Sequence, residues 1–252
     1  SAPVPQRPLH GVSAVLRLAV PVGAPAPGGW MRPAWRLRAR QDLRRKRRPR
    51  TRSLLESGMS IVIRDVQEHE LDSILALNNA AGPTILPLDA ARIRKFYDSA
   101  EYFRVAERDG TLAGFLVGMG SDADHDSSNF HWFRAHCERF FYIDRIVVSS
   151  RRRGGGVGRA FYADAQSHAE LRYPLLTCEV FLEHDADPVR LFHGSFGFHE
   201  IGQHVMPENG IRASMMAKDM CSYPWVRDTY GDDLPDVPWI SRPRVPAAVA
   251  NA

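Results

Sequence analysis

A glycine-rich turn flanked by arginines could bind an anion through its backbone. The turn Gly154-Gly155-Gly156-Val157-Gly158 follows Arg151-Arg152-Arg153 and precedes Arg159. Glycines leave backbone N–H groups uncovered, and the N-terminus of a following helix carries partial positive charge, so such a turn can hold a phosphate. Guanidinium groups donate paired hydrogen bonds, which suits a diphosphate better than a single carboxylate. These residues therefore predict a diphosphate site.

Hydrophobic patterns place this turn between a strand and a helix. Residues 140–148 are dense in aromatic and β-branched side chains, which predicts a largely buried strand. After the turn, apolar residues recur at a spacing of four, as on one face of a helix: Val157, Phe161, Ala165 and Ala169. The turn lacks the lysine and hydroxyl of a nucleoside-triphosphate loop, and its glycine spacing differs from the dinucleotide fingerprint.

The turn and a second motif resemble the GNAT superfamily of acyl-CoA N-acyltransferases. Arg153-Gly154-Gly155-Gly156-Val157-Gly158 is similar to the family's Arg/Gln-x-x-Gly-x-Gly/Ala turn, which holds the pyrophosphate of coenzyme A. Phe192-His193-Gly194-Ser195-Phe196-Gly197-Phe198 is similar to the family's Leu-Tyr-x-x-x-Gly-Phe. The resemblance covers about residues 61–220. It implies an α/β fold with a mostly antiparallel, twisted sheet, splayed at the strand before the turn and flanked by helices. It also implies acetyl-CoA as co-substrate, without a metal.

The rest of the pattern follows the order of elements that this superfamily uses. Strands are expected at 61–65, 102–107, 112–118, 175–181, 201–205 and 211–218, and helices at 68–80, 89–99 and from Asp187-Pro188 to Gly197. Asp109-Gly110 predicts a tight hairpin between the second and third strands. Beyond Met220 the chain is rich in proline, which predicts an extended tail without regular structure.

Charge and composition divide the chain into three parts. Residues 1–58 carry 13 Lys/Arg and 2 Asp/Glu, a net charge of +11. Residues 59–252 carry 20 Lys/Arg and 27 Asp/Glu, a net charge of −7. Residues 1–58 are also rich in Pro, Ala and Arg and are predicted to be disordered. A nucleic-acid arm, a transit peptide and a signal peptide are alternatives; we favour an extension upstream of a natural start at Met59. An acyltransferase domain at 59–220 and a tail at 221–252 follow.

Cysteine usage and hydropathy bear on the compartment. Cys137, Cys178 and Cys221 lack the short paired spacings of zinc or redox motifs and cannot all pair with one another, which favours a reducing compartment. No uninterrupted apolar run approaches the length of a membrane span. We therefore expect a cytoplasmic protein without membrane association.

Acyl transfer needs a base, because an aliphatic amine with a pKa of about 10 is mostly protonated at neutral pH. Asp144 lies nine residues before Arg153, where many superfamily members carry an acid, and is our first candidate; Glu179 on the next strand is the second. Asp144 could instead be a structural ion-pair partner. Adjacent side chains on a strand point to opposite faces, so Arg145 is not expected to be that partner.

The reaction also needs a donor for the developing oxyanion and an acid for the departing thiolate. The resemblance places the oxyanion donor on the backbone of Ile146, Val147 or Val148. It also puts His193 where the family usually has tyrosine. Histidine titrates near neutral pH, so His193 could protonate the thiolate, although a buried histidine held for packing is the alternative.

Residues 120–138 interrupt the expected strands with acids, histidines and Cys137. They lack the glycine and glutamate of a calcium loop and the spacing of a zinc helix, so we expect a solvated loop and no metal site. Aromatic side chains on a long connection often line clefts. This favours an acceptor-binding role for Phe130, His131, Trp132 and Phe133.

These observations favour an acetyl-CoA-dependent N-acetyltransferase that acts by direct attack in a ternary complex, because neither motif contains a cysteine. Its acceptor would be a primary amine of a small molecule or peptide, and the negative charge of residues 59–252 would attract cationic amines. One alternative is a nucleic-acid-binding protein, which the acidic main part of the chain disfavours. Another is a GNAT-like domain that binds acyl-CoA without catalysis. The sequence leaves the oligomeric state, including a homodimer, open.

Overall fold

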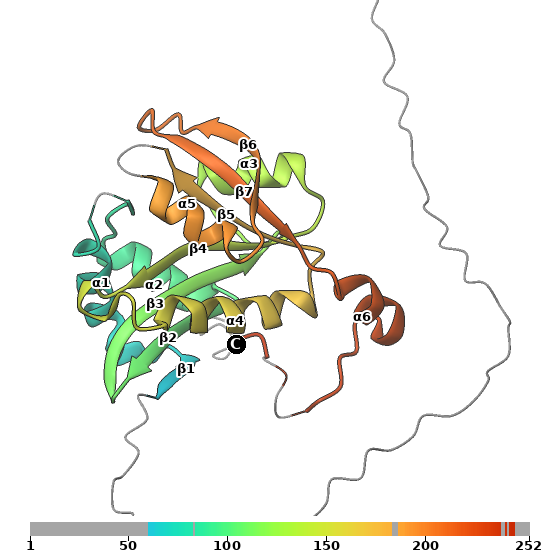
Figure 1. The fold of residues 1–252 in the computed structure, drawn as a ribbon, viewed down its shortest axis with the longest axis horizontal. Coiled ribbons are helices and arrows are strands. Elements are labelled where there is room, and N and C mark those ends of the chain that lie inside the picture. Colours follow the sequence, from blue (N-terminus) through green and yellow to red (C-terminus); the bar gives the residue numbers. More distant parts are fainter. Residues whose placement is uncertain (1–59, 83, 183–185, 238–239, 241, 245–252) are drawn as a thin grey trace, which may run out of the picture. The chain divides into compact units, whose positions relative to one another are not determined.

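The computed structural model describes residues 60–82, 84–182, 186–237, 240 and 242–244. Seven strands form one sheet in the order β1-β2-β3-β4-β5-β7-β6 (Figure 1). All neighbouring strands are antiparallel except β4 and β5, which are parallel. The predictions for residues 1–58 and for a start at Met59 concern parts of the chain outside these ranges.

The strands lie close to their predicted positions. They are β1 (Ile61–Asp65), β2 (Tyr102–Arg108), β3 (Thr111–Gly120), β4 (Phe141–Val148), β5 (Leu175–Phe181), β6 (His199–Val205) and β7 (Arg212–Asp219). The hairpin between β2 and β3 turns at Asp109 and Gly110, which both have positive φ, as the sequence predicts. The fold class expected from the resemblance, a mostly antiparallel sheet between helices, is confirmed.

Helices cover both faces of the sheet. They are α1 (Leu71–Asn79), α2 (Ala90–Ser99), α3 (Ser128–His136), α4 (Val157–Glu170), α5 (Ala186–Gly194) and α6 (Tyr223–Tyr230). Successive strand residues point to opposite faces, so Phe103 and Val105 pack with α1, α2 and α3, whereas Tyr102 and Ala106 pack with α4. In Figure 1, α4 and α5 lie in front of the sheet. All four apolar positions predicted for the face of α4 are buried.

Two irregularities in β4 shape the centre of the sheet. In the pairing with β3, Val117 is opposite Arg145 and Gly118 is opposite Ile143, so Asp144 has no partner across the strands. This is a β-bulge. On its other side, β4 pairs with β5 only through residues 141–143. Beyond Ile143 the two strands separate, as the resemblance implies for the strand before the turn.

The expected loop at residues 120–138 is wrong, because residues 128–136 form α3. Phe130 and Phe133 are fully buried in the core that α1 and α2 also cover. Their spacing of three residues places both on one helical face. The surrounding acids and histidines concealed this short apolar pattern in the sequence.

A regular element also lies in the predicted tail, contrary to expectation. Residues 223–230 form α6, with Pro224 in its first turn, where proline does not interrupt a helical hydrogen bond. Val226 of this helix is buried. Further on, the backbone N–H of Arg244 donates to Glu101 O (2.8 Å), and its guanidinium lies over the ring of Tyr97. This part of the tail therefore docks on the domain.

The boundaries of α5 differ slightly from the prediction. The helix begins at Ala186, one residue before the expected cap at Asp187, and it ends at Gly194 rather than at Gly197. Gly197 adopts a φ of 87° in the turn that leads from this helix to β6. The short turn between these two glycines is therefore not helical.

Candidate active site

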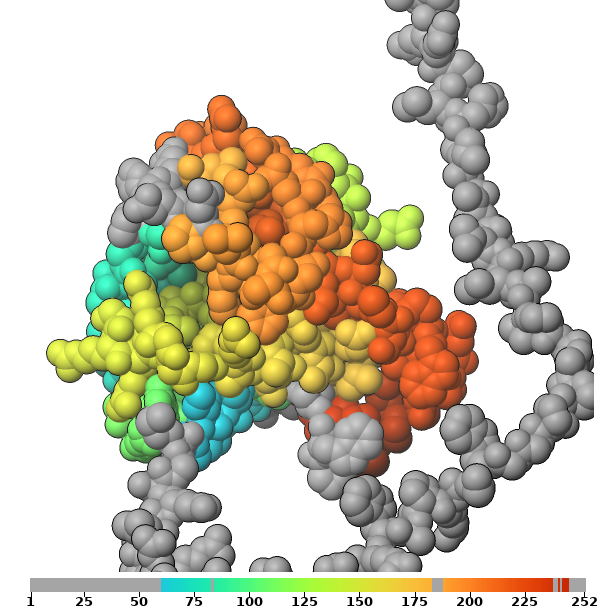
Figure 2. Space-filling view, viewed as in Figure 1, coloured from blue at the N-terminus to red at the C-terminus, as the bar shows by residue number. Residues whose placement is uncertain are grey.

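The predicted anion-binding turn has the backbone geometry that its glycines allow. Gly154 and Gly156 have φ values of 74° and 85°, a region that side chains with a Cβ rarely adopt. Gly156 immediately precedes α4, and the first N–H groups of a helix have no partner within the helix. They therefore remain available to an anion at the positive end of the helix dipole. Figure 2 shows this turn and α4 in yellow along one face, beside α5 in orange.

A cavity of about 730 Å³ extends from this turn along the gap between β4 and β5. Its walls include residues 143–148 of β4 and 178–181 of β5. The two strands pair as far as Ile143 and Cys178 and are not paired beyond them. Predicted cofactor residues that line it are Ile146, Val147, Val148, Arg152, Arg153, Gly154, Gly156, Val157, Gly158 and Arg159. Arg151 and Gly155 do not. The gap and the turn thus line one continuous cavity.

Asp144 is held by Arg145 and His125 at the bulge of β4. Its Oδ1 accepts a hydrogen bond from Arg145 Nε (2.6 Å) and its Oδ2 lies 2.9 Å from His125 Nε2. Burial would raise the pKa of Asp144, but the charge of Arg145 and the hydrogen bonds from His125 and Arg145 outweigh burial and hold that pKa well below its usual range. Asp144 is therefore ionised but poorly basic.

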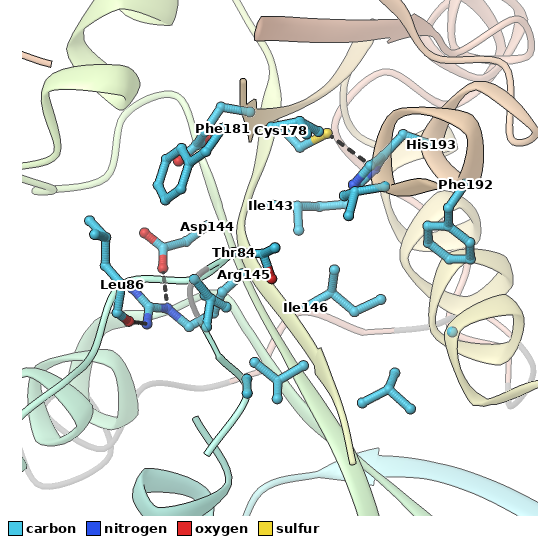
Figure 3. A pocket seen from close by; sticks show the side chains of 18 of the residues that line it. Thr84, Leu86, Ile143, Asp144, Arg145, Ile146, Cys178, Phe181, Phe192 and His193 are labelled. Carbon is cyan, nitrogen blue, oxygen red and sulfur yellow. Dashed lines mark hydrogen bonds and ion pairs between the residues drawn. The ribbon is translucent and has the colours of Figure 1, made fainter. Parts of the chain in front are cut away.

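The expectation that Arg145 could not pair with Asp144 is wrong. It assumed that successive side chains alternate between the faces of a regular strand, whereas the bulge at Asp144 disrupts this alternation. Arg145 also donates to Asn78 Oδ1 (2.9 Å) and to Leu86 O (3.3 Å), which connects the bulge to α1 and to the loop after it. Figure 3 shows Asp144 and Arg145 beside Leu86.

Glu179 on β5 also lines the cavity and has a different electrostatic environment. Tyr142 donates a hydrogen bond from its hydroxyl to Glu179 Oε2 (2.7 Å). Burial and the negative charge of Asp144 raise the pKa of Glu179 to about 7, although the hydrogen bond from Tyr142 acts in the opposite direction. A carboxylate with this pKa can take up a proton near neutral pH, which is the property of a general base.

His193 lies in the wall of the cavity on α5 and is only 4% exposed. Its Nδ1 is 2.5 Å from the hydroxyl of Tyr162 and 3.5 Å from Cys178 Sγ. Burial lowers the pKa of His193 to about 4, so its imidazole is neutral at pH 7. Figure 3 shows His193 and Cys178 linked to each other, away from Asp144 and Arg145. Burial raises the pKa of the Cys178 thiol well above its usual value.

The four residues predicted to bind the acceptor do not line this cavity. Phe130 and Phe133 belong to the core, while Trp132 packs against the ring of His136 and His131 lies next to them on α3. Asp126 and Ser127, which directly precede α3, line the cavity instead. The aromatic side chains predicted to bind the acceptor thus lie outside the cavity, and two polar residues before the helix line it.

Several lining residues were missed by the sequence analysis. They lie in the loop between α1 and α2 and in the loop between β6 and β7, and include Thr84, Ile85, Leu86, Met206 and Glu208. Neither loop carries a motif, so only the tertiary fold brings them to the cavity. In the described part of the chain, no group of three or more His, Cys, Asp or Glu side chains could hold a metal ion. No helix in these ranges has the length and apolar character that crossing a membrane requires.

Comparison with known families agrees with this geometry. Residues 84–220 match the model of the acetyltransferase (GNAT) domain, which is more than half of the chain. The chain therefore belongs to the GNAT acetyltransferase family, and the family expected from the two motifs is confirmed.

Comparison with solved structures also found similar proteins, at low sequence identity. An acetyltransferase described as a GNAT member from Desulfovibrio desulfuricans is 17% identical with a TM-score of 0.51, over 64% of this chain and 99% of its own. The protein smu.2055 from Streptococcus mutans is 17% identical with a TM-score of 0.50, and the match covers 63% of this chain and 99% of smu.2055. The ribosomal-protein-S18-alanine N-acetyltransferase of Escherichia coli is 15% identical with a TM-score of 0.49, and the match covers 64% of this chain and 94% of that enzyme. A search of curated proteins returned no match.

Proposed function

We propose that this protein is an acetyl-CoA-dependent N-acetyltransferase that transfers an acetyl group to a primary amine by direct attack in a ternary complex. The observation that carries the proposal is the continuous cavity, which joins the glycine turn to the carboxylate of Glu179 through the gap between β4 and β5. The diphosphate of coenzyme A would bind the N–H groups at the start of α4. The remainder of the coenzyme would extend along the open edge of β4.

The unpaired edge of β4 suits the thioester end of the coenzyme. Backbone groups of residues 144–148 that face β5 in a regular sheet have no strand beside them here. An N–H of Ile146, Val147 or Val148 would donate to the thioester oxygen as negative charge develops on it. Such a donor is already oriented before reaction, and this is the main source of its catalytic effect.

Glu179 is the general base in this proposal. The amine nitrogen forms a bond to the carbonyl carbon, the amine proton passes to Glu179, and the carbon–sulfur bond then breaks to release the thiolate of coenzyme A. The pKa of about 7 supports Glu179 over Asp144, whose pKa is lowered by the charge of Arg145 and by the hydrogen bond from His125. Asp144 would act as a neighbouring charge.

The environments of His193 and Cys178 support direct transfer. A neutral imidazole with a pKa of about 4 is not an imidazolium acid at pH 7, so His193 would contribute through its hydrogen bond with Tyr162 and its packing. The raised pKa of Cys178 keeps its thiol protonated, and a protonated thiol is a poor nucleophile. An acyl-cysteine intermediate at this position is therefore not proposed.

The acceptor would enter near the loops that carry Asp126 and Glu208. Both carboxylates line the cavity, and Asp126 pairs with Arg92 while Glu208 accepts from Ser128 Oγ (3.0 Å). Arg92 compensates the charge of Asp126, so the carboxylate of Glu208 is the group here that would favour a cationic amine of a small molecule or of a peptide N-terminus.

Two measurements test the proposal. Calorimetry should show binding of coenzyme A, and acetyl-CoA consumption should rise with at least one member of a panel of polyamines, amino acids and peptides with free N-termini. The Glu179→Gln variant serves as the control for catalysis, because it should bind coenzyme A without consuming acetyl-CoA. Absence of coenzyme binding at millimolar concentration would refute the proposal, whereas binding without turnover for every amine would indicate a binding domain.

A further inference from the structure

The tip of the β2–β3 hairpin contacts the glycine turn through a buried arginine. Arg108, the last residue of β2, donates from Nη1 to the carbonyl oxygen of Gly155 (3.3 Å), and its side chain is only 11% exposed. Oδ2 of the next residue, Asp109, lies 4.0 Å from Arg108 Nε and 3.5 Å from Arg152 Nη1. One carboxylate of the hairpin therefore lies between the buried arginine and an arginine of the cavity wall.

The contact with Gly155 determines the orientation of the following peptide group. In a planar trans peptide, the carbonyl and the N–H of the next residue point in opposite directions. Because the carbonyl of Gly155 points to Arg108, the N–H of Gly156 points away from it. Gly156 lines the cavity and Gly155 does not. The hydrogen bond from Arg108 thus favours the arrangement in which the carbonyl faces the protein and the N–H faces the ligand.

The fit between Arg108 and the turn is close. A Cβ at Gly155 would lie 1.7 Å from Arg108 Nη1, so the guanidinium occupies the space that a side chain at this position would need. Gly155 has an ordinary φ, unlike Gly154 and Gly156. A side chain at position 155 would therefore displace the guanidinium of Arg108, whereas Gly154 and Gly156 are favoured by their backbone conformation.

Arg108 also brings positive charge close to the proposed diphosphate site. Charges interact more strongly where water is excluded, and a buried guanidinium is screened less than one at the surface. The nearby Asp109 compensates part of this charge and also interacts with Arg152, which lines the cavity. The hairpin tip therefore acts on both the backbone and the side chains of the turn.

We propose that Arg108 is a positioning residue for the diphosphate of the coenzyme, and that it acts through the carbonyl of Gly155 without touching the ligand. This inference rests on the proposed coenzyme binding. It predicts an effect confined to ligands that carry the diphosphate, because the pantetheine part of the coenzyme would lie along β4, away from the hairpin tip.

The test compares Arg108→Met with Arg104→Met. Arg104 lies on the same strand with 12% of its side chain exposed, and it pairs with Asp65 and Asp164 rather than with the turn. Calorimetry should show that Arg108→Met weakens coenzyme A binding about tenfold, the effect of losing one hydrogen bond from a charged donor. Ligand-observed NMR should show unchanged affinity for pantetheine, which lacks the diphosphate. Arg104→Met should leave both affinities unchanged.

The outcomes separate this inference from the function on which it rests. If the wild-type protein does not bind coenzyme A, both fail. If it binds and Arg108→Met behaves like Arg104→Met, or loses affinity for both ligands equally, only the role of Arg108 fails. If Arg108→Met does not fold, Arg108→Lys replaces it: lysine keeps the charge without the planar fork, so coenzyme A affinity should fall by about threefold with pantetheine unaffected. Equal losses for the two ligands would again overturn the inference.

Discussion

At the glycine turn the cavity is lined by a run of neighbouring residues whose backbone N–H groups are proposed to bind the ligand, whereas around the bulge of β4 the proposed chemistry depends on side chains from several separate segments. The turn and the first residues of α4 are contiguous in the sequence. The carboxylate region combines Asp144 of β4 and Glu179 of β5 with His125 and Asn78 from two other segments. The first region is thus local in the chain, and the second exists only in the folded protein.

This difference leads to different sensitivities. A site made from backbone groups should be damaged by changes in backbone conformation or support, and should tolerate the loss of one surface charge. A site made from coupled side chains should respond to removal of single atoms, and its response should depend on pH. The following predictions use this contrast, in order of decreasing expected effect.

The largest effect is expected for Glu179→Gln. This change removes the proposed base but keeps the shape of the side chain, so the turnover of acetyl-CoA with an accepted amine should fall by about 10² to 10⁴, the usual contribution of general base catalysis. Binding of coenzyme A, measured by calorimetry, should change little, because the turn is unaffected. A variant that retained more than a tenth of wild-type turnover would assign the base to another group.

A smaller effect on binding is expected for Gly156→Ala. Its φ of 85° disfavours alanine by roughly 1–2 kcal/mol, so the backbone at the start of α4 should shift and coenzyme A affinity should fall by about tenfold. Gly231→Ala is the matched control, because Gly231 also has a positive φ (62°) but follows α6. Both variants should lose stability in thermal unfolding, and only the first should lose affinity. Equal affinities in calorimetry would show that the turn does not hold the ligand.

A change in pH dependence is expected for Asp144→Asn. Activity of the wild-type protein should fall as the pH drops below about 7, because Glu179 becomes protonated. The negative charge of Asp144 contributes to the raised pKa of Glu179, so the neutral variant should shift this acidic limb to lower pH. Turnover measured between pH 5 and 9 checks the shift. If the acidic side of the pH profile were unchanged in Asp144→Asn, the charge of Asp144 would not affect the pKa of the base.

The same variant should be less stable than the wild type, with a defined pH dependence. The folded-state pKa of Asp144 is lowered, so its ionised form stabilises the protein above its unfolded pKa of about 4. That contribution is lost as the pH falls below this value. The difference in free energy of unfolding between wild type and Asp144→Asn should therefore be largest near neutral pH and shrink in acid, as denaturant titrations at several pH values would show.

The smallest effect on the pH profile is expected for His193→Gln. With a pKa of about 4, His193 does not titrate between pH 5 and 8, so the shape of the profile in this range should remain that of the wild type. Because the hydrogen bond between His193 and Tyr162 contributes to stability, the His193→Gln variant should unfold at a lower temperature than the wild type. Loss of a basic limb together with a fall of a hundredfold or more in turnover would instead support the acid role expected from the family position.

Patterns within a short stretch of sequence were sufficient to predict most of the fold. The strand before the turn, the face of α4 and the hairpin at Asp109 are local features, because they depend on periodicity and on turn residues. The two missed helices show the limit of this approach. In α3 the apolar pair Phe130 and Phe133 was too short to detect among polar residues, and in α6 a proline in the first turn was taken as a sign of irregular structure.

The sequence by itself determined the backbone conformation of the glycine turn, since glycines permit a positive φ immediately before the start of a helix, whatever packs around them. Only the tertiary structure decided the roles of the side chains. The bulge placed Arg145 beside Asp144, burial made the imidazole of His193 a neutral group, and the nearby charge of Asp144 contributed to the raised pKa of Glu179. Desolvation and charge coupling depend on distances between segments far apart in the chain, which no local pattern encodes.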